Sequence, residues 1–120
     1  MTGFREGYIY RLMAPAQWQG LSQCEHIPYS PDDDRDGFFH MSTPEQALDT
    51  AARHYSAHPK LYAIGCPEEA PGDLLKWEPS RGGALFPHIY GDVETRWFDH
   101  IVPLVRHKEG ATPAFGVVHP

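Results

Sequence analysis

The sequence predicts one small domain of the α+β class, with few helices and a small, strongly bent sheet whose strands pair in mixed or antiparallel fashion. The chain has 120 residues, a common length for one domain around one core. Strand-like segments outnumber helical ones, and the connections are short and turn-rich, which disfavours a doubly wound parallel sheet. We expect a single domain over residues 1–120, with its core over about 8–105 and a C-terminal extension over 106–120.

The first third of the chain contains two strand candidates separated by polar sequence. Tyr8–Leu12 alternates large apolar residues with other side chains, which predicts a strand, and Pro15–Gln23 predicts a short helix around Trp18. His26–Asp36 is rich in Pro, Ser and Asp and predicts a surface loop. Phe38–Met41 then predicts a second strand.

The clearest local signal is a helix start at Thr43. This residue is a good N-cap, Pro44 falls at the first helical position, and Gln46 completes a capping box. Pro59 predicts that the helix ends just after His58. The apolar face of this helix consists of Ala47, Leu48, Ala51, Ala52 and Tyr55.

The second half predicts a series of strands. Pro103 lacks the N–H of a ladder donor and predicts that the last strand lies at a sheet edge. The tail Lys108–Pro120 shows no clear periodicity, so we expect either a packed extension or a partly disordered segment. The four strand candidates are Leu61–Cys66, Leu74–Trp77, Phe86–Tyr90 and Ile101–Val105.

Composition excludes several classes of protein. The chain is 41% hydrophobic, slightly below the globular norm, and its 22% of charged residues shows none of the excess that marks disordered chains. No apolar run approaches the ~20 residues of a membrane span. The opening MTGFREGYIY has no apolar run suited to export, so we expect a cytoplasmic protein without a membrane partner. A formal net charge of −6 and basic residues scattered along the chain argue against a nucleic-acid groove. Cys24 and Cys66 form no C-x-x-C pair, so we expect two buried thiols.

Two motifs suggest metals, and neither is complete. Asp32, Asp34, Asp36 and Gly37 match the opening of an EF-hand loop, but Thr43 occupies the position that needs a bidentate Glu. We therefore expect no metal from this motif.

The second metal motif is a pair of histidines on the predicted helix. His54 and His58 lie four residues apart, a spacing that allows a shared metal. No third ligand lies nearby in the sequence. A favourable interaction of imidazole with the helix C-terminus is the alternative explanation.

The sequence predicts a polar cluster around the second strand. His40 and Ser42 fall on one strand face, immediately before the helix N-terminus, where Ser42, Thr43 and free N–H groups would suit a phosphate or another anion. The alternative is that His40 is a hydrogen-bonded core residue and that Ser42 and Thr43 only cap the helix.

A second cluster lies on the predicted strand Phe86–Tyr90. Phe86, His88 and Tyr90 share one face, which suits either a stacking pocket for a planar ligand or an ordinary core. Glu78 ends the preceding strand, where active-site acids often lie and where a solvated surface acid is the alternative.

The segments IYRL, DGFFHMSTPEQ, LKWE and FPHIYG occur in that order over roughly residues 8–105. This combination resembles the bacterial family known as domain of unknown function 952. The resemblance implies a fold similar to the ADP-ribosylation fold, in which two small sheets enclose NAD. On that likeness, Arg11 would contact phosphate, His40 and Ser42 the ribose, and Phe86 or Tyr90 the nicotinamide ring, while Glu78 would stabilise the cationic transition state.

Three functions follow as hypotheses. The first is an NAD-consuming transferase or hydrolase acting on a small molecule or an RNA end, with Glu78, His40 and His88 as catalytic residues and Arg11, Ser42, Thr43, Phe86 and Tyr90 as cofactor contacts. The second is a non-catalytic domain that binds a nucleotide-like small molecule. The third is a metal-dependent enzyme that uses His40, His88 and Glu78. The enzyme hypothesis requires these three residues to meet at one concave pocket. A structural or interaction role is the remaining alternative.

Overall fold

The computed structural model describes residues 3–109 and 112–118, apart from the side chains of Arg81 and Glu109. It confirms the α+β class. The larger sheet has four strands in the order β1-β3-β6-β7, and all neighbours are antiparallel. Its strands are β1 (Tyr8–Met13), β3 (Lys60–Pro67), β6 (His100–Glu109) and β7 (Thr112–Val117).

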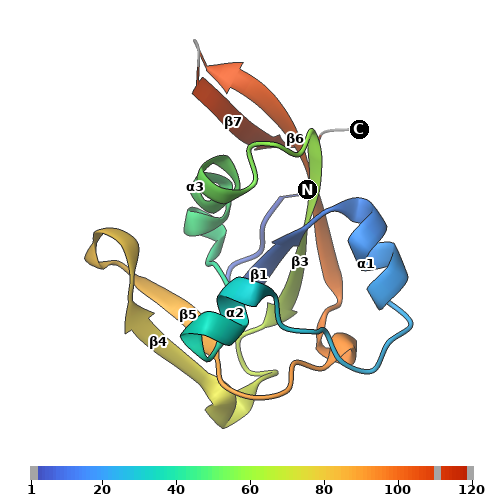
Figure 1. The fold of residues 1–120 in the computed structure, drawn as a ribbon, viewed down its shortest axis with the longest axis vertical. Helices are drawn as coiled ribbons and strands as arrows, with labels where there is room; N and C mark the ends of the chain where they lie inside the picture. Colours follow the sequence, from blue (N-terminus) through green and yellow to red (C-terminus); the bar gives the residue numbers. More distant parts are fainter. Residues whose placement is uncertain (1–2, 110–111, 119–120) are drawn as a thin grey trace.

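The smaller sheet has three antiparallel strands in the order β2-β5-β4. Figure 1 shows its β4–β5 hairpin projecting to one side of the four-stranded sheet. An isolated bridge between Tyr10 and Ser42 joins the segment after β2 to the free edge of β1, with both backbone hydrogen bonds at 2.8 Å. The strands of this smaller sheet are β2 (Phe39–His40), β4 (Leu75–Pro79) and β5 (Leu85–Ile89).

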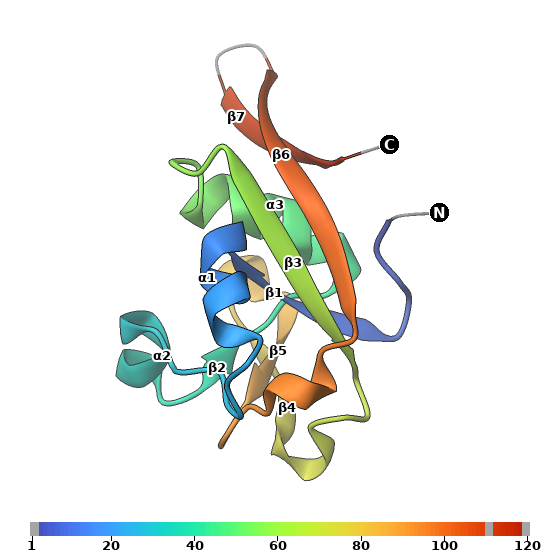
Figure 2. The same cartoon turned by 90° about the vertical axis from the view of Figure 1, so that its right-hand side faces the viewer.

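The main helices cover opposite faces of the larger sheet because side chains alternate along β1. Ile9 and Met13 face one apolar cluster, against which Trp18 of α1 (Pro15–Leu21) packs. Tyr10 and Leu12 face a second cluster with the apolar side of α3 (Pro44–His54). Figure 2 shows α1 and α3 on the two sides of β3. Short 3₁₀ helices cover Gly72–Leu74, Arg81–Gly83 and Thr95–Trp97.

The predicted surface loop over His26–Asp36 is wrong at its second half, which forms helix α2 (Pro31–Asp36). Ser30 caps this helix: its hydroxyl accepts from the Asp33 N–H, and the Asp33 carboxylate accepts from the Ser30 N–H. Gly37 ends the helix in the left-handed region at φ 85°. The helix exists because the cap is reciprocal, which outweighs the low helix propensity of the Asp run.

Helix α3 begins as predicted, with the capping box between Thr43 and Gln46, but it ends at His54 rather than just after His58. Tyr55 leaves helical geometry (φ −127°, ψ 21°) and packs against the second apolar cluster. The two histidines therefore do not share a helix face as the i,i+4 spacing predicted.

Strand β6 is not an edge strand, contrary to the prediction from Pro103. The Pro103 carbonyl accepts from the Val118 N–H on the β7 side, at the point where the β6–β7 ladder ends. Because the N and O of a strand residue point to the same side, the missing N–H removes no bond to β3. The tail contains a strand, β7, held by Phe115, which is 4% exposed. Residues 110–111 and 119–120 of that prediction lie outside the described residues.

Cys66 is buried, as expected, whereas Cys24 is exposed, because it follows α1 on the surface. Among the described residues, no helix is long and apolar enough to cross a membrane.

Candidate functional site

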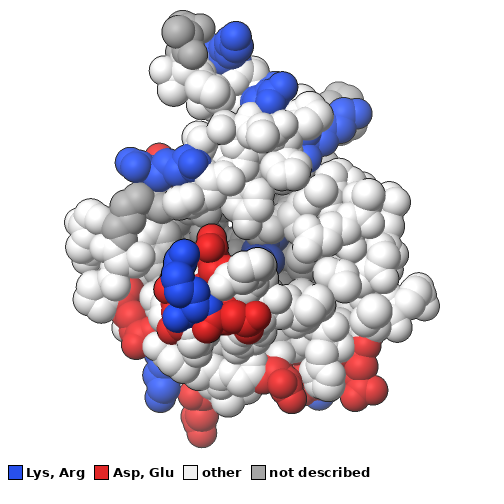
Figure 3. All heavy atoms as spheres, viewed as in Figure 1, with Lys and Arg blue, Asp and Glu red and all other residues white. Residues whose placement is uncertain are grey.

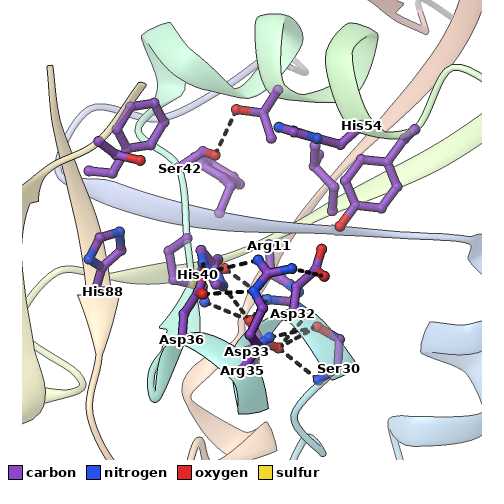
Figure 4. A pocket seen from close by; sticks show the side chains of 17 residues that line it. Arg11, Ser30, Asp32, Asp33, Arg35, Asp36, His40, Ser42, His54 and His88 are labelled. Atoms are coloured by element: carbon purple, nitrogen blue, oxygen red, sulfur yellow. Dashed lines mark hydrogen bonds and ion pairs between the residues drawn. The ribbon is translucent and has the colours of Figure 1, made fainter. Parts of the chain in front are cut away.

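A cavity of about 350 Å³ opens beside the free edge of β1, between α2 and α3. Each neighbouring element contributes a polar side chain to its wall. Figure 4 shows Arg11 and the α2 carboxylates on one side, His88 on another, and Ser42 and His54 near α3. Segments far apart in the sequence therefore meet at one concave site.

Arg11 and Asp33 form a buried ion pair in the wall of this cavity. The guanidinium donates to both carboxylate oxygens, at 3.0 and 2.8 Å, and to the His40 carbonyl at 3.0 Å. It also lies over the Phe39 ring, 4.1 Å from the ring centroid. The side chains are 12% and 1% exposed, so the pair holds β1, α2 and β2 together in a desolvated setting.

Asp33 accepts several further hydrogen bonds. The Ser30 N–H and hydroxyl donate to one oxygen, and the His40 N–H and Nδ1 lie 3.0 and 2.6 Å from the other. Burial raises the pKa of this carboxyl, but the hydrogen bonds from His40 and Arg11 and the charge of Arg11 together lower the pKa far below its usual range. Asp33 is therefore a permanent, internally neutralised anion.

His40 lies between two carboxylates. Its Nδ1 is 2.6 Å from Asp33 and its Nε2 is 2.9 Å from Asp36. The hydrogen bond to Asp33 raises the pKa of His40, and burial opposes that change. Both ring nitrogens are engaged, so neither is available to a ligand without breaking one of these bonds.

His88 is arranged differently. Its Nδ1 is 2.8 Å from Oε1 of Glu78, which also accepts from the Tyr90 hydroxyl at 2.7 Å. The hydrogen bonds from His88 and Tyr90 lower the pKa of Glu78. The His88 side chain is 5% exposed, and its Nε2 has no hydrogen-bond partner among the described residues. A carboxylate on Nδ1 favours the neutral tautomer in which Nε2 is a bare acceptor.

Phe38 packs between the two histidines. Its ring stacks on His88 at 3.9 Å with an interplanar angle of 20°, and its centroid is 4.6 Å from that of His40. The imidazoles themselves are 5.7 Å apart. Phe38 therefore fixes the plane of His88 while Glu78 fixes its rotation.

The structure brings five of the predicted site residues to the cavity wall and leaves three outside it. Arg11, His40, Ser42, Phe86 and His88 line the cavity. Thr43, Glu78 and Tyr90 do not, although Glu78 and Tyr90 reach it through His88.

Ser42 and Thr43 are engaged within the protein. The Ser42 hydroxyl donates to Thr50 at 3.2 Å. Thr43 exchanges capping hydrogen bonds with Gln46, whose side chain accepts from the Thr43 N–H. These bonds use the groups that were expected to bind an anion.

Sequence reasoning missed Asp33 and Phe38. A signal existed for both: Ser30-Pro31-Asp32-Asp33 repeats the pattern of Thr43-Pro44-Glu45-Gln46, and Phe38 shares the period-two face of His40. The first signal overlaps the EF-hand match, which uses the neighbouring acids Asp32, Asp34 and Asp36. Those acids lie on α2 instead of in a ligand loop.

A metal-dependent enzyme would need a cluster of metal-ligating side chains. No group of three His, Cys, Asp or Glu side chains among the described residues is spaced to hold a metal ion. His40, His88 and Glu78 do not form such a group.

Comparisons with known proteins locate the chain within a family. Residues 12–100 match the family model described as "Protein of unknown function (DUF952)". The crystal structure of protein CC0527 from Caulobacter crescentus is similar, with 34% identity and a TM-score of 0.77 over 88% of this chain and 92% of that chain. Its solution NMR structure gives 34% identity and a TM-score of 0.74 over 87% and 90%. No curated protein matches. This chain belongs to the DUF952 family.

Proposed function

We propose that the cavity binds the nicotinamide riboside portion of NAD and that His88 acts as the base in cleaving its glycosidic bond. One observation carries the proposal: a buried histidine presents an unpartnered Nε2 at a cavity while a carboxylate holds its Nδ1. A ring nitrogen that reaches a cavity without a protein partner is available to hydrogen-bond a ligand or water there. A carboxylate–imidazole pair is also the usual arrangement of a positioned general base.

The size and chemistry of the cavity support this ligand. A volume of about 350 Å³ lies at the lower end of small-molecule sites, which suits one nucleoside better than a whole dinucleotide. Carboxylates of Asp32 and Asp36 in the wall suit ribose hydroxyls and the positive nicotinamide ring. Phe86, which is 8% exposed, offers an apolar surface to a planar ring.

The proposed step balances without an added acid. His88 Nε2 takes a proton from water, or from an acceptor hydroxyl, as its oxygen attacks C1′ of the ribose. The bond between C1′ and the nicotinamide nitrogen breaks, and its electron pair neutralises the pyridinium. The positive charge that develops on the ribose is stabilised by Asp36, whose pKa is lowered by the hydrogen bond from Arg35.

This assignment changes the roles expected from the family likeness. Glu78 acts through His88 as a positioning residue, because it does not line the cavity. Asp33 neutralises the Arg11 charge, and Asp32 and Asp36 pair with Arg35, so both arginines position the carboxylates of the site and are not free cations for the NAD phosphates. The ADP-ribosylation-like fold remains part of this proposal.

The second candidate is a non-catalytic domain that binds a nucleotide-like molecule. The observation that favours it is that both ring nitrogens of His40 are hydrogen-bonded to carboxylates. Of the two histidines, only His88 then has a ring nitrogen that could transfer a proton. A binder retains the cavity and its ligand and releases no nicotinamide.

The test has a binding arm and a turnover arm. The purified protein is titrated with NAD, nicotinamide riboside, ADP-ribose and nicotinamide in a thermal-shift assay, because a ligand at 100 times its Kd stabilises by ~2.7 kcal/mol. Nicotinamide release from NAD is then followed by chromatography for the wild type, His88→Asn and Glu78→Gln.

The proposal expects shifts with NAD and nicotinamide riboside, turnover by the wild type, and a loss of turnover of about 100-fold or more in His88→Asn. His26→Ala, an exposed histidine outside the cavity, is the matched control and should behave as the wild type. Binding without turnover selects the second candidate, and no shift with any of the four compounds refutes both.

A further inference from the structure

The basic residues of this acidic protein gather at one end. Segments 53–60 and 106–108 contain four Lys or Arg and three His and no Asp or Glu, whereas the rest of the chain has six Lys or Arg against 16 Asp and Glu. We call this set the basic end; it consists of Arg53, His54, His58, Lys60, Arg106, His107 and Lys108.

The fold makes these two segments contiguous. The Arg106 N–H donates to the Pro59 carbonyl at 2.9 Å, and its guanidinium donates to the Ser56 carbonyl at 2.7 Å. Lys60 pairs with Val105 in the β3–β6 ladder. Figure 3 shows Lys and Arg gathered over the end that holds β6, β7 and the last turn of α3, while Asp and Glu lie around α2 and the opposite end.

Three of the four Lys and Arg side chains of the basic end lack an ion pair within the described part of the chain. Arg11, Arg35 and Arg96 each pair with a carboxylate elsewhere in the molecule. Lys60, Arg106 and Lys108 make no ion pair with any side chain that the structure describes, and Arg53 pairs only with exposed Asp49. An isolated positive field on a protein of net charge −6 attracts polyanions to this end alone.

We propose that the basic end binds the phosphate backbone of a single-stranded nucleic acid whose terminal nucleotide lies at the mouth of the cavity. His54, which belongs to the basic end, and the neighbouring Tyr55 both line the cavity. A strand bound along the basic end therefore reaches the mouth of the cavity.

A membrane surface fits the basic end less well. Among the described residues, the exposed aromatic side chains Trp77 and Tyr90 lie on β4 and just after β5, outside the basic end, so they give the charges no interfacial aromatic anchor. That the bound strand serves as an acceptor rests on the proposed NAD chemistry; the binding itself does not.

The test measures fluorescence anisotropy of labelled 12-nucleotide RNA and DNA strands against protein concentration at several salt concentrations. The double variant Lys60→Glu/Lys108→Glu is compared with Arg5→Glu/Arg96→Glu, which changes the net charge equally at exposed positions outside the basic end. We expect the first variant to bind at least about tenfold more weakly and to lower the slope of log K against log salt by about 1.4, because single strands contribute ~0.7 per phosphate contact. The control should stay within about twofold of the wild type.

Several results would overturn the proposal. Equal loss in both double variants would assign the effect to overall charge. Binding to vesicles of anionic lipid, without binding to either oligonucleotide, would assign the surface to membranes. Unlabelled RNA is expected to compete more strongly than polyglutamate at equal charge concentration, because its terminal nucleotide also contacts the mouth of the cavity, and equal competition by the two would make the surface a general polyanion site. Oligonucleotide binding is measured without NAD, and nicotinamide release is measured without oligonucleotide, so failure of the NAD proposal is separable from failure of this one.

Discussion

Asp33 accepts hydrogen bonds from three other residues, namely Arg11, Ser30 and His40. It therefore joins the first strand, the second helix and the second strand through one carboxylate. The arrangement is stable only while both charges of the ion pair remain, because an unpaired buried charge is costly. The geometry of the site therefore depends on one fully buried carboxylate, that of Asp33.

Replacing Asp33 with Asn should destabilise the protein by about 3 kcal/mol, since it leaves the Arg11 guanidinium without its anion. Chemical denaturation measures the change. Asp34→Asn, an exposed acid of the same helix, is the control and should lie within about 0.5 kcal/mol of the wild type. A cost below about 1 kcal/mol for Asp33→Asn would contradict the buried ion pair.

The raised pKa of His40 predicts a pH-dependent stability. A group whose pKa is raised on folding stabilises fully below its unfolded pKa, here about 6.5, and loses that contribution as pH rises through the folded pKa. The Tm difference between the wild type and His40→Gln should therefore be largest near pH 5 and shrink toward pH 9. Melting curves across this range test it, and a difference that grows with pH would reverse the assignment.

Residue identities were predicted better than residue roles. His40 and His88 were found because period-two spacing places them on strand faces, and both line the cavity. The engagement of His40 by two carboxylates depends on Asp33 and Asp36, which come from a helix that was read as a loop. Side-chain orientation across elements is not encoded in local spacing.

At the scale of elements, the same short pattern starts both helices that flank the cavity. Ser30 and Thr43 are each followed by Pro and form reciprocal capping boxes. The second was predicted because an apolar face follows it, whereas α2 has six residues and buries only Asp33. Helices of this length carry no periodicity, so only the cap reveals them.

Replacing Ser30 with Ala should cost more than replacing Thr43 with Ala, for which about 1 kcal/mol is expected. The Ser30 hydroxyl both accepts from the Asp33 N–H and donates to its carboxylate, so its loss also weakens the buried network. Urea denaturation of the two variants gives the comparison. Equal costs would show that the Ser30 hydroxyl acts only as a cap.

Strand β3 requires glycine at position 65. A Cβ there would lie 2.5 Å from the Tyr10 ring, which is fully buried. Gly65→Ala should therefore destabilise by about 1–3 kcal/mol through overpacking. Gly20→Ala in α1, where no atom lies within 4 Å of the added carbon, is the control. It should be neutral or stabilising by up to about 1 kcal/mol, and thermal melts that rank the pair otherwise would contradict the packing.

Over the whole molecule, the two sheets meet at the bridge between Tyr10 and Ser42, and the cavity opens beside it. The class of fold and most strands follow from alternation and turn residues. The division into two sheets does not, because strand order depends on long-range pairing such as β1 with β3. The scattered basic residues likewise form one end only after β3 and β6 have paired.

The central claim is that His88 presents a bare Nε2 to a ligand in the cavity. Nitrogen-15 NMR of the histidine side chains measures it directly, with His88→Asn used to assign the signals. We predict that the neutral His88 ring carries its proton on Nδ1 and that NAD or nicotinamide riboside shifts its Nε2 resonance, while His26 does not respond. A proton on Nε2 of the neutral ring, or an unchanged His88 signal at saturating ligand, would contradict the account.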